Sequence, residues 1–155
     1  MKEKEYLVVA TKEELLLPEA VVAMERGLPV IITGVGGTNI IETLSLLPRD
    51  IKLLNVGYCG SDKFPKGKAV EVSYCRLYHP NCTFREKEYH VGIGNTNTVC
   101  LTAGDFVQDG ELPDNSVCDM ELAYICALGF KVRAVKYVSD GLDYKEYVDS
   151  SGNKE

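Results

Sequence analysis

The chain has 155 residues, of which 45% are hydrophobic and 26% are charged, and its net charge is −6. This length predicts a single domain over residues 1–155 with one buried core. The acidic balance leaves no basic surface for a phosphate backbone, and no apolar run is long enough to cross a bilayer. The charged amino terminus lacks the features of an export signal. We therefore expect a soluble, cytoplasmic protein that binds a small molecule and has neither a nucleic acid nor a membrane partner.

Six cysteines are scattered along the sequence, and several of them lie in apolar runs. This distribution indicates free buried thiols rather than disulfides. A zinc site needs ligands at short spacing, but the chain has no Cys-x-x-Cys pair and only two histidines, His79 and His90. We therefore expect no metal and no cofactor.

The amino-terminal third alternates apolar runs with helical patterns. Thr11 is a plausible cap for a helix that Pro18 interrupts or restarts and that Gly27 ends. Around this helix we expect strands at 6–10, 28–33 and 51–56, a glycine turn at 34–37, a helix at 38–47 and a loop at 57–60.

The rest of the chain continues this alternation. The segments 69–77 and 88–93 alternate like strands that extend the sheet, and a strand at 99–102 follows. The segment 117–128 has helical spacing and predicts a well-buried helix. A last strand at 132–138 stops at Ser139-Asp140-Gly141. Together these elements predict an α/β fold with a mixed, mainly parallel central sheet flanked by helices.

Ligand sites in such folds lie beyond the carboxyl ends of the strands. The loops 11–14, 34–39, 57–60 and 139–143 leave those ends and can converge on one cleft. The glycine turn at 34–37 could offer backbone N–H groups to a hydroxyl or an oxyanion, but it is equally typical of a simple tight turn. It matches neither the dinucleotide-binding pattern nor the P-loop.

Two acidic segments have both a structural and a functional interpretation. In Asp119-Met120-Glu121, two carboxylates flank a methionine before an apolar segment. They could simply favour a helix amino terminus, or they could belong to a buried site in which each charge needs a partner. Asp140 follows a strand and could either cap the next turn at Leu142 or carry chemistry.

Several segments of the chain resemble segments of the nucleoside phosphorylase superfamily, and they follow one another in the same order. The resemblance is to the methylthioadenosine and S-adenosylhomocysteine nucleosidases in particular. The most specific matches are Asp119-Met120-Glu121, which looks like Val-Glu-Met-Glu, and 138–143, which looks like Ile-Ser-Asp-x-Ala-Asp. Segment 55–60 resembles Asn-Thr-Gly-Ser-Ala-Gly. The resemblance implies a truncated version of the family fold without an early strand, a segment before the Gly104 loop and the closing helix.

The resemblance also implies roles for individual residues. Asp140 would protonate the leaving purine, and Glu14 would activate water on the opposite face of the sugar, because cleavage passes through an oxocarbenium-like state. Glu121 would bind the sugar hydroxyls. The other implied substrate-binding residues are Met120, Ser139, Phe106, Val107, Gly60, Tyr58, whose bulk could fill the water site, and Phe84 from a second subunit.

The resemblance thus implies a purine nucleoside N-glycosidase that acts as a homodimer or higher homo-oligomer. Asn55 stands where phosphorylases have an arginine, which favours hydrolysis over phosphate-dependent cleavage. Lys136 stands at the place of an arginine in the last strand and lacks its bidentate geometry. A catalytically silent homologue that binds a nucleoside or assembles with partners is the alternative, and a structural domain without a ligand is a third option.

Overall fold

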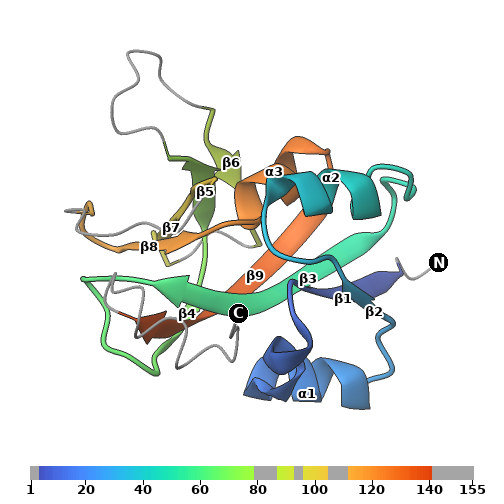
Figure 1. Cartoon of the computed structure of the whole chain (residues 1–155), viewed down its shortest axis with the longest axis horizontal. Helices are drawn as coiled ribbons and strands as arrows, with labels where there is room; N and C mark the ends of the chain where they lie inside the picture. Colours follow the sequence, from blue (N-terminus) through green and yellow to red (C-terminus); the bar gives the residue numbers. More distant parts are fainter. Residues whose placement is uncertain (1–3, 79–86, 93–95, 105–111, 141–155) are drawn as a thin grey trace.

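The computed structural model describes residues 4–78, 87–92, 96–104 and 112–140. Within them, nine strands form one mixed sheet, and helices lie on both of its faces (Figure 1). No helix in this part of the chain is long and apolar enough to cross a membrane. The expected α/β fold with a mainly parallel sheet flanked by helices is confirmed.

The strands and helices follow each other in the expected alternation. The strands are β1 (Glu5–Val9), β2 (Val30–Ile32), β3 (Lys52–Gly60), β4 (Ala69–Glu71), β5 (Tyr74–Leu77), β6 (Tyr89–His90), β7 (Val99–Thr102), β8 (Ser116–Asp119) and β9 (Lys131–Asp140). The helices are the 3₁₀ helix η1 (Lys12–Leu16) and the α-helices α1 (Pro18–Glu25), α2 (Gly37–Leu44) and α3 (Leu122–Ala127). Pro18 begins α1 at a position where a missing N–H costs nothing.

Most strand pairs of the sheet are parallel. β1 lies between β2 and β3, β3 pairs with β9, and β7 lies between β5 and β8, all of them parallel. The antiparallel pairs are β4 with β9, β5 with β6, and the end of β3 with β8. The carboxyl ends of β1, β3 and β9 therefore point in the same direction, which is where ligands bind in open α/β sheets.

The two faces of the sheet are covered by different helices. α1 packs Ala20 and Ala23 onto one face, against a cluster completed by Leu7, Val9, Leu54 and Val56. α2 and α3 pack onto the other face through a larger cluster that includes Ile40, Leu44, Leu122 and Ile125. In Figure 1, α1 lies below the sheet and the other two helices lie above it. The residues of β3 and β9 consequently alternate between two buried environments.

Strands β3 and β9 both continue further than the sequence predicts. The expected loop at 57–60 is wrong, because these residues extend β3 and pair with β9 in register from Lys52↔Lys131 to Cys59↔Val138. The expected end of the last strand at Val138 is also wrong, since β9 reaches Asp140. The register shifts between Cys59 and Gly60, so that Gly60 lies opposite Asp140 and Ser139 is an extra residue.

The expected helix over 117–128 is wrong in its first part. Residues 116–119 form β8, which pairs with β7 in the register Cys100↔Val117, and α3 begins only at Leu122. Pairing along the sheet therefore overrides the local helical pattern. The segment 69–77 also differs, because it is divided into β4 and β5, which pair with different strands.

The cysteines confirm the expectation of free buried thiols within the described residues. Cys59, Cys75, Cys100, Cys118 and Cys126 are all buried and unbridged, whereas Cys82 lies outside the described residues.

We predict that Leu54→Ala lowers the free energy of unfolding by about 3 kcal/mol, because Leu54 is fully buried under α1 and its truncation leaves a cavity. Urea denaturation followed by circular dichroism measures this change. Leu16→Ala is the control, since the Leu16 side chain is 81% exposed and its loss should cost less than about 0.5 kcal/mol. Equal effects of the two substitutions would contradict the described packing.

Candidate active site

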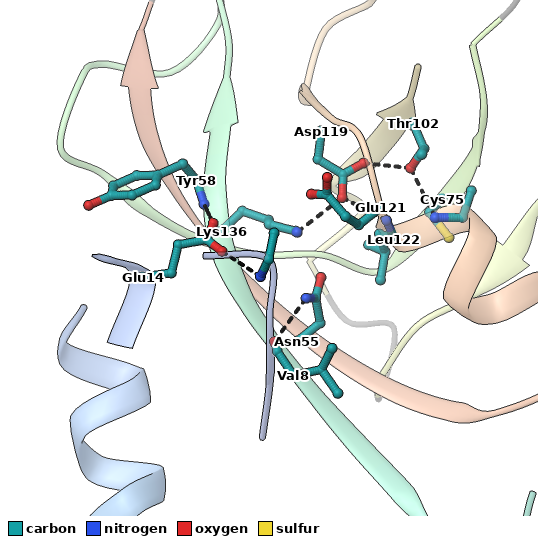
Figure 2. A network of polar contacts seen from close by, with 12 residues as sticks. Val8, Glu14, Asn55, Tyr58, Cys75, Thr102, Asp119, Glu121, Leu122 and Lys136 are labelled. Carbon is teal, nitrogen blue, oxygen red and sulfur yellow. Dashed lines mark hydrogen bonds and ion pairs between the residues drawn. The ribbon is translucent and has the colours of Figure 1, made fainter. Parts of the chain in front are cut away.

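Four charged side chains meet beyond the end of β1, between β3, β8 and β9 (Figure 2). They are Glu14 from η1, Asp119 from the end of β8, Glu121 at the start of α3 and Lys136 from β9. Each of these residues is at most 7% exposed. Because burying a charge is costly, each of them needs a partner in the cluster.

Glu14 completes the hydrogen bonding of the strand end beside it. β1 pairs with β3 only as far as Asn55, so the N–H of Tyr58 lies beyond the end of its neighbour. The Glu14 Oε2 atom accepts this N–H at 2.8 Å, and its Oε1 atom accepts the N–H groups of Ala10 and Thr11 at 2.7 and 3.1 Å. Burial raises the pKa of Glu14 above its usual value, although Lys136 and these three N–H groups oppose the shift.

A glycine makes room for Glu14. Gly57 is the register partner of Lys136, and a Cβ atom on it would lie 2.7 Å from the Glu14 Oε2 atom and 3.3 Å from the Lys136 Nζ atom. A side chain at this position would push the Glu14 carboxylate away from the strand. Gly57 therefore allows a close approach inside a strand rather than a turn.

Lys136 forms a buried ion pair with Asp119. The Lys136 Nζ atom lies 3.0 Å from the Asp119 Oδ2 atom, which also accepts the N–H of Leu122 at 2.8 Å. The Thr102 hydroxyl donates to the other carboxylate oxygen at 2.5 Å. Burial favours the neutral forms, but the pairing outweighs it, so that the pKa of Lys136 is raised and that of Asp119 is lowered. Both groups are charged in the folded protein.

The glycine turn at 34–37, from which we expected free backbone N–H groups, donates one of these groups to the side chain of Glu121. Gly36 has a φ of 93°, a conformation that favours glycine, and its N–H donates to the Glu121 Oε2 atom at 2.9 Å. The turn before α2 and the start of α3 are thus held together through Glu121. The next residue, Gly37, lies so close to the Tyr124 ring that a Cβ atom would approach it to 2.6 Å.

Asp140 and Ser139 end β9 on the other side of this arrangement. Asp140 is fully buried, and the Ser139 hydroxyl donates to its Oδ2 atom at 2.9 Å. Gly60, which lies opposite Asp140, ends β3. The strand pair therefore brings the residues that the sequence singles out at 60, 139 and 140 together.

Tyr58 does not fill the space beside Lys136. Its side chain follows those of Leu54 and Val56, which lie in the cluster under α1, and its register partner Tyr137 packs against the same cluster. Figure 2 shows the Tyr58 ring directed away from the charged cluster. The Tyr58 ring thus lies on the face of β3 opposite to Lys136, and its backbone N–H is the group that meets Glu14.

Of the remaining predicted site residues, Met120 belongs to the described part of the chain and three others do not. Met120 is half-buried between Asp119 and Glu121. Phe84, Phe106 and Val107 lie outside the described residues.

Asn55, whose amide N–H group donates to the Val8 carbonyl at 3.1 Å, has a buried side-chain oxygen without a hydrogen-bond partner among the described residues.

Lys136 is the member of the cluster that the sequence analysis did not include among the site residues. A period-two pattern could have identified it, because it falls on the same face of the strand as Val132, Ala134 and Val138, whereas Lys131 and Arg133 fall on the other. A lysine on an apolar strand face requires a buried acidic partner.

A cavity of about 590 Å³ lies at the other end of the two long strands. It is lined by residues at their amino ends and from the adjoining edge of the sheet: Lys52, Glu71, His90, Gly92, Phe130, Lys131, Val132 and Arg133. Arg133 is bound there by Glu71 at 3.0 Å and by Glu19 at 3.6 Å. None of the charged residues of the candidate site lines this cavity.

We predict that Lys136→Met lowers the free energy of unfolding by about 3 to 5 kcal/mol near neutral pH, because it leaves Asp119 buried without its cation. The pKa of Asp119 is lowered by folding, so this stabilisation is present above its unfolded pKa and is lost as the pH falls through the folded value. The cost should therefore shrink as the pH falls below the ordinary aspartate pKa of about 3.9. Urea denaturation across pH measures it, with the exposed Lys131→Met as the control. A cost that does not depend on pH would contradict the pairing.

Comparisons with known proteins identify the fold. No protein-family model and no curated protein matches the chain. Among solved structures, a variant of the nucleosidase MTAN of Chlamydia trachomatis superposes with a TM-score of 0.75 at 17% identity, over 98% of this chain and 89% of the other. The same enzyme bound to adenine gives 0.74 at 16%, with the same coverage. A futalosine hydrolase mutant of Helicobacter pylori gives 0.71 at 12%, over 98% and 91%. The chain thus has the nucleoside phosphorylase and nucleosidase fold.

Proposed function

We propose that the protein hydrolyses the N-glycosidic bond of a purine nucleoside of the methylthioadenosine or S-adenosylhomocysteine type. The observation that carries this proposal is the placement of two carboxyl groups along β3. Glu14 approaches the strand at Gly57, and Asp140 lies opposite Gly60. Three residues of extended strand span roughly 10 Å. The two groups thus approach β3 at separate positions, as a mechanism with one carboxyl group on the leaving group and another on the attacking water requires.

In this proposal, each carboxyl group has a separate task. Asp140 protonates the leaving base, and Glu14 takes a proton from the attacking water on the opposite face of the sugar. The raised pKa of Glu14 suits a base that works near neutral pH. Glu121 binds the sugar hydroxyls and orients the ring between the two groups. Met120, which is half-buried beside Glu121, packs against the sugar.

The charges around Glu14 favour water over phosphate as the nucleophile. The cation nearest to it in the cluster is Lys136, which is already engaged by Asp119 at 3.0 Å. A phosphate dianion placed in this cluster would meet the carboxylates of Glu14 and Asp119 and one lysine that Asp119 already engages, and like charges at such distances repel strongly in a buried site. A water molecule meets no such repulsion.

The structural neighbours support a purine ligand. The MTAN of Chlamydia trachomatis has been solved with adenine and, as a variant, with MTA, and the latter structure superposes on this chain with a TM-score of 0.73 at 16% identity. We infer from this likeness and from Asp140 that the ligand of this protein is an adenine nucleoside.

We predict that the protein releases free base from methylthioadenosine without added phosphate. Asp140→Asn and Glu14→Gln should each lower kcat by at least about 100-fold, because each substitution removes a group that transfers a proton. Chromatography of the released base measures this, and the exposed Asp114→Asn is the matched control. Turnover that Asp140→Asn leaves unchanged would refute the proposed role of this residue. Stabilisation by adenine in a thermal-shift assay without any turnover would instead support a catalytically silent nucleoside-binding protein.

We further propose a homodimer, in which Phe84 of one subunit closes the site of the other. Ile41 in α2 and Leu46 just after it are 49% and 94% exposed, and they supply apolar surface that association would bury. Light scattering should give twice the monomer mass of 17.1 kDa, and Leu46→Glu should shift the protein toward the monomer. The exposed Glu42→Gln serves as the control. A monomer at high concentration would contradict this proposal.

A further inference from the structure

The charged cluster of the candidate site contains more acidic groups than its cation can neutralise. Three elements contribute the acidic side chains Glu14, Asp119 and Glu121, and β9 contributes Lys136. All four are buried, so bulk water screens their interactions poorly. With every group charged, the cluster would have a net charge of about −2 in a medium that disfavours even one unpaired charge. A proton on one of the carboxyl groups relieves most of this cost.

The hydrogen bonds show which carboxyl group is least able to stay ionised. Asp119 contacts the Lys136 ammonium at 3.0 Å, the Thr102 hydroxyl at 2.5 Å and the Leu122 N–H at 2.8 Å. These contacts with a cation, a hydroxyl and a backbone N–H group favour the ionised form.

Glu14 is also surrounded by donors. It accepts three backbone N–H groups, from Ala10, Thr11 and Tyr58, at 2.7 to 3.1 Å. Burial raises the pKa of Glu14, but these three N–H groups and Lys136 oppose the shift and favour the carboxylate.

Glu121 has weaker support for a negative charge. It accepts one backbone N–H, from Gly36, at 2.9 Å. The charged groups that face it are Asp119 from β8, Glu14 from η1 and Lys136 from β9, whose charge is already matched by Asp119. The neighbouring strand β3 contributes Gly57, which has no side chain, and the Cys100 thiol of β7 lies near Asp119 and Lys136.

We propose that Glu121 is a neutral carboxylic acid in the ligand-free site and that it donates this proton in a hydrogen bond to a ligand hydroxyl. The second half of this statement rests on the proposed function, because it assumes a sugar in the site. A neutral acid both donates and accepts, whereas a carboxylate only accepts. It therefore suits a diol, in which one hydroxyl can accept from Glu121 while the other donates to it.

The pKa of Glu121 supports the same assignment. Burial raises it to about 8, and the charges of Asp119 and Glu14 act in the same direction. Lys136 and the Gly36 N–H group oppose the shift without cancelling it. Glu121 is therefore mostly protonated at neutral pH and loses its proton as the solution becomes mildly alkaline.

Carbon-13 NMR of the side-chain carboxyl groups tests the proposal on the ligand-free protein. With ¹³C-labelled glutamate, the Glu121 signal, assigned through its own side-chain and backbone atoms, should titrate with a midpoint near 8. It should be absent from Glu121→Gln. A midpoint below about 5, close to the ordinary value of glutamate, would overturn the proposal. This titration requires no activity, so it decides the charge of Glu121 even if the protein cleaves no nucleoside.

Unfolding measurements provide a second readout. Because the folded pKa of Glu121 lies above the unfolded one, the folded state binds more protons between the two values, and stability must fall as the pH rises through that range. The melting temperature of the wild type should fall more steeply than that of Glu121→Gln between about pH 6 and pH 9, since glutamine does not titrate. Equal slopes would contradict the proposal.

Ligand binding tests the donated hydrogen bond. Calorimetry with methylthioadenosine on Asp140→Asn, which the proposed function expects to turn over at least about 100-fold more slowly, should show about tenfold weaker binding at pH 9 than at pH 7. This factor corresponds to the loss of the proton from a group with a pKa near 8. If the affinity does not change between pH 7 and pH 9 while the NMR midpoint is near 8, Glu121 is neutral in the free protein but does not donate a hydrogen bond to the ligand. Absence of any binding would contradict both the donor role and the proposed function.

Discussion

The buried pair of Lys136 and Asp119 is the interaction on which the candidate site depends. An ion pair that is removed from water is stable only with close geometry and additional hydrogen bonds, and Asp119 has both through Thr102 and Leu122. The pair also links three parts of the fold, because Lys136 belongs to β9, Asp119 ends β8 and Leu122 begins α3. Its geometry therefore positions the helix that carries Glu121. The position of Glu121 in turn holds the turn before α2 through Gly36.

The long pair of strands β3 and β9 determines how the other groups meet this ion pair. Gly57 lies beside Lys136 and provides the space through which Glu14 approaches, and the end of β1 leaves the Tyr58 N–H free to bind Glu14. Further along, the register shift between Cys59 and Gly60 places Asp140 opposite Gly60. A site with two separated carboxyl groups thus follows from strand register and from one missing side chain, without a long loop.

Much of the architecture could be predicted from the sequence. Short apolar runs that alternate with helical patterns indicated the α/β class, and the acidic segments at 119–121 and 138–143 indicated which strand ends to examine. The ends of the long strands could not be predicted, because Gly57-Tyr58-Cys59-Gly60 has the composition of a turn and becomes a strand only through its pairing with β9. The helix predicted over 117–128 was wrong in its first part for a related reason, because β8 forms backbone hydrogen bonds with β7.

The chemistry of the site was less predictable than its location. The direction of the Tyr58 ring, for example, depends on which face of β3 it occupies, and the same face of this strand packs Leu54 and Val56 into the cluster under α1. Likewise, the resemblance suggested Glu121 as a partner for sugar hydroxyls, but its charge depends on Asp119, Glu14 and Lys136, which come from different elements. Spatial neighbours that are distant in the sequence control such properties.

In our proposal, these groups form one nucleoside site at the carboxyl ends of β3 and β9. A crystal structure of Asp140→Asn grown with methylthioadenosine tests this arrangement. We expect the purine to lie beside residue 140, the sugar hydroxyls to lie within hydrogen-bond distance of Glu121, and a water molecule to lie between Glu14 and the anomeric carbon. A nucleoside bound in the cavity between Lys52 and Arg133, or elsewhere away from Glu121, would contradict it.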